Sequence, residues 1–98
     1  MTIKKLLISN RGEIASRIIK SAHDMGITCV AIYTEADKNT PYVREAEQSF
    51  KLSDSYLNDK EILEIAKKNN VDAIHPGYGF LSENANFANN VKKAGIIW

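Results

Sequence analysis

Short apolar runs alternate with longer amphipathic stretches along this sequence, and this alternation most limits the folds open to it. Residues 3–9 contain the block Leu6-Leu7-Ile8 with no period of two, which is typical of a strand covered on both faces. Further strands are predicted at residues 28–33, 49–52, 71–74 and 96–98. Strands separated by helices pack as a parallel sheet with right-handed crossovers. We therefore predict a Rossmann-like, doubly wound α/β fold with a parallel sheet of about five strands.

Three polar positions stand where helices are predicted to begin. Asn10 is a candidate N-cap for an amphipathic helix that ends at Gly26. Asn58 and Glu61 form an Asn-x-x-Glu capping pattern for a helix that runs to residue 70. Ser82 is a candidate cap for the last helix, which precedes the final apolar run.

Composition and charge favour a small metabolite as ligand. The chain is 44% hydrophobic and 26% charged, as is usual for a globular domain. Its 13 basic and 12 acidic side chains are interspersed, so we expect neither nucleic acid nor a membrane as partner. No signal peptide and no apolar run near the ~18 residues of a membrane span are recognisable, which favours a cytoplasmic location. The single cysteine, Cys29, is predicted to be a buried, reduced thiol.

The sequence is interpreted as one domain, residues 1–98, of a longer protein. No linker, low-complexity tract or internal repeat divides it. Trp98 lies inside the predicted fifth strand with no turn signal after it, and a natural domain boundary rarely falls at such a point. We therefore expect a segment that is truncated at its last strand.

Two loops follow strands that are predicted to be neighbours. They are residues 9–13, after the first strand, and residues 75–84, after the fourth. In a 3-2-1-4-5 strand order, the first and fourth strands lie side by side where the order reverses. Ligands of doubly wound sheets bind outside the carboxyl ends of such strands. We therefore expect the two loops to converge on one site.

The glycines of these loops do not match a nucleotide-binding fingerprint. Gly12 is the only glycine of the first loop, so neither Gly-x-Gly-x-x-Gly nor the phosphate-cradling Gly-x-x-x-x-Gly-Lys pattern is present. In the second loop, Gly77 and Gly79 either serve the turn or let backbone N–H groups approach a ligand. Tyr78 between them either fills the core or offers an exposed face to a flat ligand.

Other polar residues near this edge each have a structural and a functional interpretation. For His75, a structural hydrogen-bonding group is favoured over a base. For the acidic segment 33–37, a solvated turn is favoured over a ribose-binding acid. No second histidine or cysteine lies in metal-ligand spacing along the chain, so no metal is expected.

A narrow charged stripe runs along the helix predicted after the first loop. It is formed by Glu13, Arg17, Lys20 and Asp24. The stripe is either a solvated face or a subunit contact.

The two loops carry motifs that resemble the biotin carboxylase family, the ATP-dependent component of acetyl-CoA, propionyl-CoA, pyruvate and related carboxylases. The motifs are Ile8-Ser9-Asn10-Arg11-Gly12-Glu13-Ile14-Ala15 and His75-Pro76-Gly77-Tyr78-Gly79-Phe80-Leu81-Ser82-Glu83-Asn84. The spacing between them agrees as well, through Ala36-Asp37, Ala46-Glu47 and Ser55-Tyr56-Leu57. The resemblance covers essentially the whole chain.

The resemblance implies the N-terminal, pre-ATP-grasp domain of a ligase several times this length. In the family, a downstream ATP-grasp domain binds MgATP and bicarbonate, forms carboxyphosphate and transfers the carboxyl group to biotin on a carrier protein. Biotin, ATP and Mg²⁺ are thus the implied cofactors of the intact enzyme, and this segment alone is expected to bind none of them tightly and to be inactive. The implied partners are the biotin carboxyl carrier protein, the carboxyltransferase component, the remaining domains of the same chain and a second subunit in a homodimer.

The resemblance also assigns positions to the site. It implies no catalytic residue and no metal ligand in this segment, and it places Tyr78 near biotin. The candidate residues of the substrate cleft are Gly77, Tyr78, Gly79, Asn10, Arg11, Gly12, Glu13 and His75. For the charged stripe it favours a subunit contact made by Arg17, Lys20 and Asp24.

An alternative from another class is a stand-alone Rossmann-type module that binds a nucleotide or metabolite. Tight nucleotide binding by this segment would favour the module, whereas the absence of binding would favour a carboxylase fragment. A third possibility is that the segment mainly supplies an assembly surface.

Overall fold

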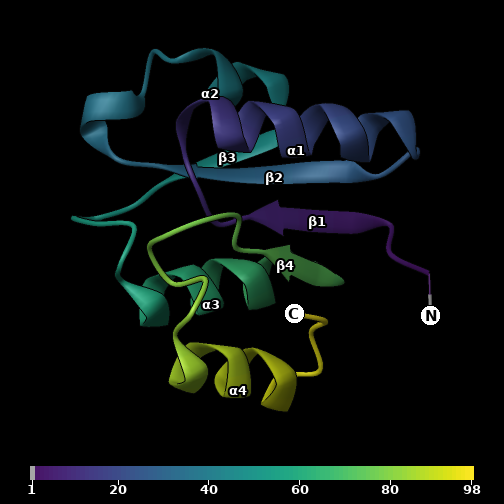
Figure 1. The fold of residues 1–98 in the computed structure, drawn as a ribbon, viewed down its shortest axis with the longest axis vertical. Helices are drawn as coiled ribbons and strands as arrows, with labels where there is room; N and C mark the ends of the chain where they lie inside the picture. The colour runs from purple at the N-terminus through teal and green to yellow at the C-terminus, as the bar shows by residue number, and fades with distance from the viewer. Residues whose placement is uncertain (1) are drawn as a thin grey trace.

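The computed structural model describes residues 2–98 and contains a four-stranded parallel sheet with helices on both faces (Figure 1). The strands are β1 (Lys5–Ile8), β2 (Thr28–Tyr33), β3 (Gln48–Lys51) and β4 (Ala73–His75). Their order in the sheet is β3-β2-β1-β4, and each pairing is parallel. The chain thus moves from β1 to one edge and then crosses to the other, which confirms the doubly wound α/β fold.

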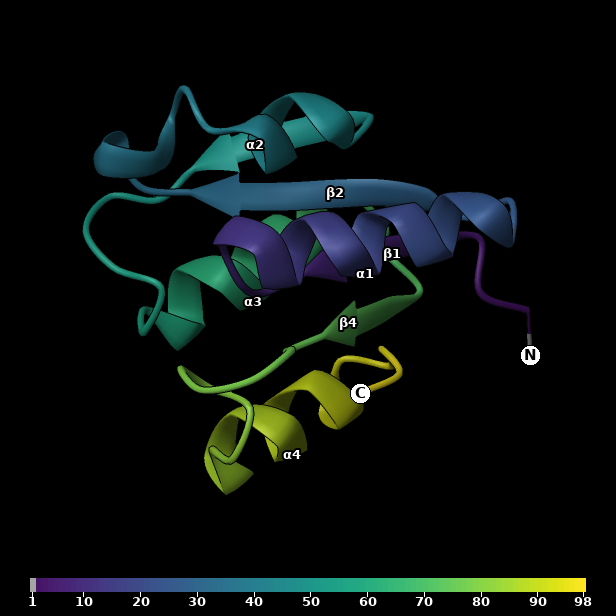
Figure 2. The same ribbon diagram turned by 45° about the horizontal axis from the view of Figure 1, so that its top comes forward.

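Helices α1 (Gly12–Asp24) and α2 (Pro41–Glu45) cover one face of the sheet, and α3 (Asp59–Lys68) and α4 (Ala85–Lys93) cover the other (Figures 1 and 2). A short 3₁₀ helix, η1 (Glu35–Asp37), follows β2. In β1, Leu7 packs with α3 and α4, whereas Leu6 and Ile8 pack with α1 and α2. Both faces of the strand are buried, which explains its unbroken apolar run.

The helix caps agree with the sequence at one start and differ at two. Asn58 accepts a hydrogen bond from the Glu61 N–H at 3.2 Å, as predicted. Asn84, not Ser82, caps α4, because its Oδ1 accepts the Phe87 N–H at 2.9 Å. Asn10 does not cap α1, which has no side-chain cap at its N-cap residue. The amide of Asn10 instead binds the second loop.

The predicted strand at residues 96–98 is reduced to a single bridge between Ile97 and Ala73. The Ile97 N–H donates to Asp72 O and the Ile74 N–H donates to Ile97 O, each at 2.9 Å. A strand needs successive pairs of this kind, so the prediction of a fifth strand is corrected to one bridging residue at the β4 edge.

Cys29 is fully buried, as expected. Among residues 2–98, no helix has both the length and the apolar character needed to cross a bilayer.

Candidate functional site

The loops after β1 and β4 meet at the carboxyl edge of the sheet, as predicted. Ile8 and His75 are paired at the strand ends, and the Ser9 N–H continues the ladder by donating to His75 O at 2.9 Å. Beyond them, Asn10 Nδ2 donates to Pro76 O at 2.8 Å and to Tyr78 O at 2.7 Å. One amide from the first loop therefore fixes the backbone of the second.

The Asn10 side chain is buried, with 1% of its surface exposed, and all of its polar atoms are used. Both amide hydrogens go to the second loop, and Oδ1 accepts the Arg11 N–H at 2.8 Å. A buried amide that lost these partners would cost about 1–3 kcal/mol for each unsatisfied group. This demand explains why Asn10 faces the loop and is not available to cap α1.

Gly77 is required by close packing against that amide. Its φ is +65°, in the left-handed region that favours glycine, and a Cβ at this position would lie 2.6 Å from Asn10 Nδ2 and 3.0 Å from Ile14 Cγ2. Of the two interpretations offered by the sequence, the turn accounts for Gly77. Gly79 also has a positive φ, +70°, but an added Cβ would meet nothing within 4 Å.

Tyr78 is 79% exposed, which excludes the interpretation that it fills the core of this domain. It does not fill the core, and its ring is available at the surface. Phe80, two residues later, has a φ of +47°, which is unusual for a bulky side chain. Its ring packs on Tyr56 with the centroids 5.2 Å apart. The second loop is therefore fixed at one end by Asn10 and at the other by Tyr56.

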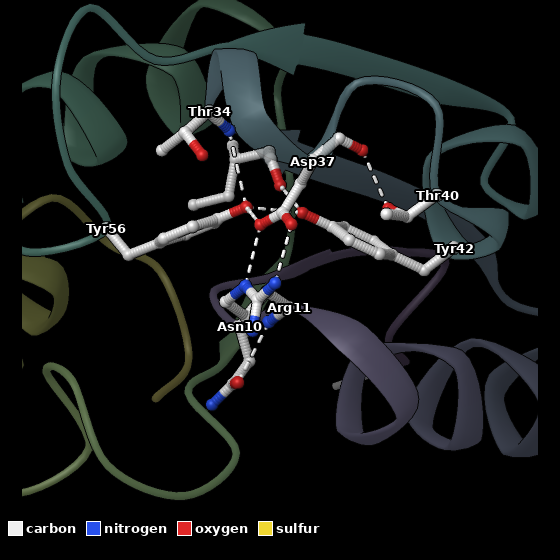
Figure 3. A network of polar contacts seen from close by, with 8 residues as sticks. Asn10, Arg11, Thr34, Asp37, Thr40, Tyr42 and Tyr56 are labelled. Carbon is white, nitrogen blue, oxygen red and sulfur yellow. Dashed lines mark hydrogen bonds and ion pairs between the residues drawn. The ribbon is translucent and has the colours of Figure 1, made fainter.

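A polar network behind the first loop holds Arg11 (Figure 3). Arg11 Nε and Nη2 donate to the two carboxylate oxygens of Asp37, each at 2.6 Å. The Tyr56 hydroxyl donates to Asp37 Oδ2 at 2.5 Å. The Tyr42 hydroxyl lies 2.6 Å from the Tyr56 hydroxyl and 2.9 Å from Ile32 O, in β2, and donates its single proton to one of these two oxygens. The bidentate ion pair is thereby anchored to the sheet.

The charges of this network are strongly coupled. Hydrogen bonds from Arg11 lower the pKa of Asp37, and they outweigh its burial, which acts in the opposite direction. The same pairing raises the pKa of Arg11. Burial raises the pKa of both Tyr42 and Tyr56, so the two phenols keep their protons. Arg11 is thus a permanent cation whose charge is already matched.

The interpretation of segment 33–37 as a solvated turn is wrong for Asp37. Its side chain is buried, with 3% of its surface exposed. It is equally not available as a ribose-binding acid, since both of its oxygens are engaged. In the sequence, Arg11 and Asp37 each follow a predicted strand, so both were expected at the carboxyl edge of the sheet. This shared edge was the only sequence signal for the Arg11–Asp37 ion pair. It gave no sign of the two tyrosines.

The remaining predicted residues are His75, Glu13 and the charged stripe on α1. His75 is exposed, and its Nδ1 accepts the Gly77 N–H at 3.1 Å, which agrees with the structural interpretation. Glu13 pairs with Arg17 one turn later, at 3.0 Å. The charged stripe lines an open groove of about 390 Å³ beside α1, which is bounded by Glu45 of α2. The groove is formed by Glu13, Ser16, Arg17, Ile19, Lys20, His23, Asp24 and Glu45.

Known proteins have sequences similar to that of this chain. Residues 2–98 match the family described as "Biotin carboxylase, N-terminal domain". Biotin carboxylase 1 of Bacillus subtilis is 50% identical over 101 residues, which cover 98% of this chain and 22% of the relative. Pyruvate carboxylase of Staphylococcus aureus is 49% identical over 100 residues, covering 96% and 9% respectively. This chain therefore spans less than a quarter of the length of these relatives.

Two solved structures have the same fold. The biotin carboxylase domain dimer of Hydrogenobacter thermophilus 2-oxoglutarate carboxylase, in complex with MgADP, ADP and bicarbonate, has a TM-score of 0.94 and 40% identity. The match covers 98% of this chain and 22% of that chain. Pyruvate carboxylase of Rhizobium etli has a TM-score of 0.94 and 39% identity, covering 99% and 11%. These similarities do not favour the stand-alone Rossmann module.

Replacing Gly77 by alanine tests the packing against Asn10. We expect Gly77→Ala to lower the free energy of unfolding by about 3 kcal/mol, because a left-handed backbone conformation and overpacking each cost about 1–2 kcal/mol. Gly79→Ala is the matched control, since it has a similar φ and open space around it, so only the backbone cost remains. Urea unfolding of the full-length protein measures both losses. Equal losses would contradict the packing argument.

The Arg11–Asp37 pair predicts a pH dependence of stability. Because the pKa of Asp37 is lower in the folded protein than in the unfolded chain, its contribution is complete above an ordinary carboxyl pKa and is lost as the pH falls through the lower folded value. We expect Asp37→Asn to lower the free energy of unfolding by about 2 kcal/mol near pH 7. This loss is smaller than that for a fully buried ion pair, because Arg11 is half exposed. The difference from wild type should shrink in acid.

The matched control for this prediction is Glu35→Gln. Lys38 and Lys51 lower the pKa of Glu35 to about 2, but this side chain is 60% exposed and its ion pairs are screened by solvent. We expect a small change in thermal unfolding at either pH. An effect of Glu35→Gln as large as that of Asp37→Asn would contradict the importance of the buried network.

Proposed function

We propose a function for this chain from the fact that it belongs to the family of biotin carboxylase N-terminal domains. The intact protein is an ATP-dependent ligase that carboxylates biotin on a carrier protein, with bicarbonate as the source of the carboxyl group. This segment shapes one wall of the catalytic cleft and contributes to the subunit contact. The chemistry itself belongs to residues outside this chain.

The observation that carries the proposal is the attachment of the Tyr78 loop to Asn10. Two hydrogen bonds from one buried amide fix the carbonyls of Pro76 and Tyr78 and so hold the exposed Tyr78 ring at the carboxyl edge of the sheet. Doubly wound sheets bind their ligands at this edge. An exposed aromatic ring on a fixed backbone is a surface on which a flat ligand packs.

The residues at this edge fit biotin better than they fit MgATP. Tyr78 offers an uncharged face, and Gly79 beside it leaves open space for a ligand. The nearby carboxylates already have cationic partners, since Asp37 pairs with Arg11 and Glu13 pairs with Arg17. We therefore assign ATP and Mg²⁺ to other parts of the intact protein. Biotin, when bound, supplies the atom that accepts the carboxyl group, and the residues described here orient it.

The proposed partners follow from the same family membership. They are the biotin carboxyl carrier protein, the carboxyltransferase component, the remaining domains of the chain and a second subunit. The second subunit is assigned to the outer face of α1, where Arg17, Lys20 and Asp24 line the open groove. The absence of nucleic-acid and membrane partners and the cytoplasmic location stay predictions.

The Tyr78→Ala variant of the full-length protein tests the proposed function. We expect wild type to cleave ATP in a reaction that depends on both biotin and bicarbonate. We expect Tyr78→Ala to raise KM for biotin about 10-fold, because the loss of an aromatic contact is worth roughly 1–1.5 kcal/mol. KM for ATP should not change. Met25→Ala is the control, since Met25 is similarly exposed, at 76%, but lies beyond the other end of α1.

The two parts of the proposal fail in different ways. ATP cleavage that does not depend on biotin would contradict the proposed activity of the intact protein. Normal biotin kinetics in Tyr78→Ala would leave that activity standing and contradict the role of this loop. Tight binding of nucleotide by Gly77 to Gly79, lost on mutation of Tyr78, would contradict the assignment of ATP elsewhere.

The subunit contact is tested by reversing charge on the outer face of α1. We expect the double variant Arg17→Glu, Lys20→Glu to sediment as a monomer where wild type sediments as a dimer, because like charges placed in a contact oppose association. The matched control is Lys92→Glu, Lys93→Glu, which makes the same change of charge at the exposed end of α4. An unchanged mass in the α1 variant would contradict the contact.

A further inference from the structure

A second group of reactive side chains lies at the amino edge of the sheet, opposite the proposed cleft. His23 is in the last turn of α1, Cys29 is the second residue of β2, and Glu47 immediately precedes β3. One ligand atom from each of the three lies within 4.8 Å of the others. The expectation that no metal ligands come together rested on spacing along the chain, and it did not anticipate a cluster assembled by the fold.

The strand register fixes two members of this cluster. β2 and β3 are parallel with Val30 opposite Gln48, so Cys29 lies beside Glu47 one residue earlier. The Cys29 N–H donates to Glu47 Oε1 at 2.7 Å, which orients the carboxylate. The backbone of the sheet thus fixes the orientation of the Glu47 side chain. Hydrogen bonds to metal-binding side chains orient those ligands in the same way.

The packing of α1 supplies the third member. Ile19 and Ala22 are buried in the same core cluster as Cys29, which brings the last turn of α1 over the start of β2. His23 Nε2 then lies 2.9 Å from Glu47 Oε2 and 3.0 Å from Oε1. Helix C-termini also favour a positive charge. The three side chains therefore meet because of the fold and not by a surface rotamer alone.

The three members of the cluster differ in their exposure to solvent. The His23 and Glu47 side chains are 37% and 45% exposed in this domain, so an ion can reach them from solvent before a second subunit covers the α1 groove that His23 also lines. Cys29 lies beneath them with no exposed surface. Its Sγ has only a long contact, 3.9 Å, to Ile27 O. The sulfur is therefore free of strong hydrogen bonds and close to the two surface ligands.

The donor set selects the class of ion. Thiolate, imidazole and carboxylate are the ligands of Zn²⁺, whereas Mg²⁺ and Ca²⁺ prefer oxygen ligands alone. Zinc bonds of about 2.0–2.3 Å place neighbouring ligand atoms about 3.3–3.6 Å apart in a tetrahedron. The observed separations bracket this range, from 2.9 Å to no more than 4.8 Å. A thiolate and a carboxylate together also balance the two positive charges of the ion.

We propose that His23, Cys29 and Glu47 bind a divalent cation of the zinc class, with the fourth coordination position open to water. The ion takes His23 Nε2, Cys29 Sγ and one Glu47 oxygen, and the thiol proton leaves to solvent. Burial raises the pKa of Cys29 to about 11, so coordination itself must drive this ionisation, as it does for metal-bound thiols. The bound ion ties α1 to β2 and β3.

Cobalt is the probe for this site, because a Co²⁺–thiolate bond gives a charge-transfer absorption band in the near ultraviolet. We expect Co²⁺ to produce the band in the full-length protein and Zn²⁺ to remove it by competition. Cys29→Ser should abolish the band. His23→Gln and Glu47→Gln should each weaken Co²⁺ binding by roughly 10-fold or more, a loss that even supporting groups around a metal produce.

Glu45→Gln is the matched control, because Glu45 is an exposed carboxylate two residues before Glu47 that accepts a hydrogen bond from Ser16. It should bind Co²⁺ as wild type does. The proposal is overturned by the absence of a band, by a band that survives Cys29→Ser, or by unchanged affinity in both His23→Gln and Glu47→Gln. If circular dichroism shows that Cys29→Ser fails to fold, the His23→Gln variant decides, since that side chain lies at the surface.

Discussion

The buried amide of Asn10 is the contact on which the rest of the carboxyl edge depends. It satisfies two carbonyls of the second loop, and it can reach them only because Gly77 carries no side chain. The next residue, Arg11, is held by Asp37, and Asp37 is held by Tyr56. Tyr56 in turn packs on Phe80, which brings the chain of contacts back to the second loop. Each loop is therefore fixed through the other.

Helix α1 connects the carboxyl edge, the charged stripe and the His23 cluster, and His23 lines the same groove as the stripe. Its first residue follows the Asn10–Arg11 pair at the carboxyl edge, its outer face carries the charged stripe, and its last turn carries His23 at the amino edge. The buried side of the helix, through Ala15, Ile19 and Ala22, packs on the sheet along this whole length. Because a packed helix moves as a rigid element, its position at one edge constrains the other. The placement of α1 is therefore the structural link between the proposed cleft, the proposed subunit contact and the proposed metal site.

The sequence predicted the architecture well and the polar contacts poorly, and the reason is physical. Strand order, buried strand faces and loop convergence follow from apolar patterning and from the parallel connection rule, both of which are local signals. The partners of Asn10, Asp37 and Cys29 are 68, 26 and 18 residues away, respectively, and no local pattern specifies them. Cap preference was also misleading at Asn10, because its Nδ2 hydrogens are directed to carbonyls of the other loop and its Oδ1 accepts the Arg11 N–H. Local rules failed where a polar side chain serves a distant segment.

The strained geometry of the second loop supports the proposed role of Tyr78 in binding. Phe80 adopts a positive φ that costs a bulky residue free energy, and the contact of its ring with Tyr56 holds it there. The loop then presents Tyr78 to solvent, although burying that ring would have stabilised the fold. A loop that is fixed at Asn10 and at Phe80 has little conformational entropy left to lose when a ligand packs on Tyr78. Pre-organisation of this kind lowers the free-energy cost of binding. The second loop provides it, because its backbone is fixed at two points while the Tyr78 ring stays exposed.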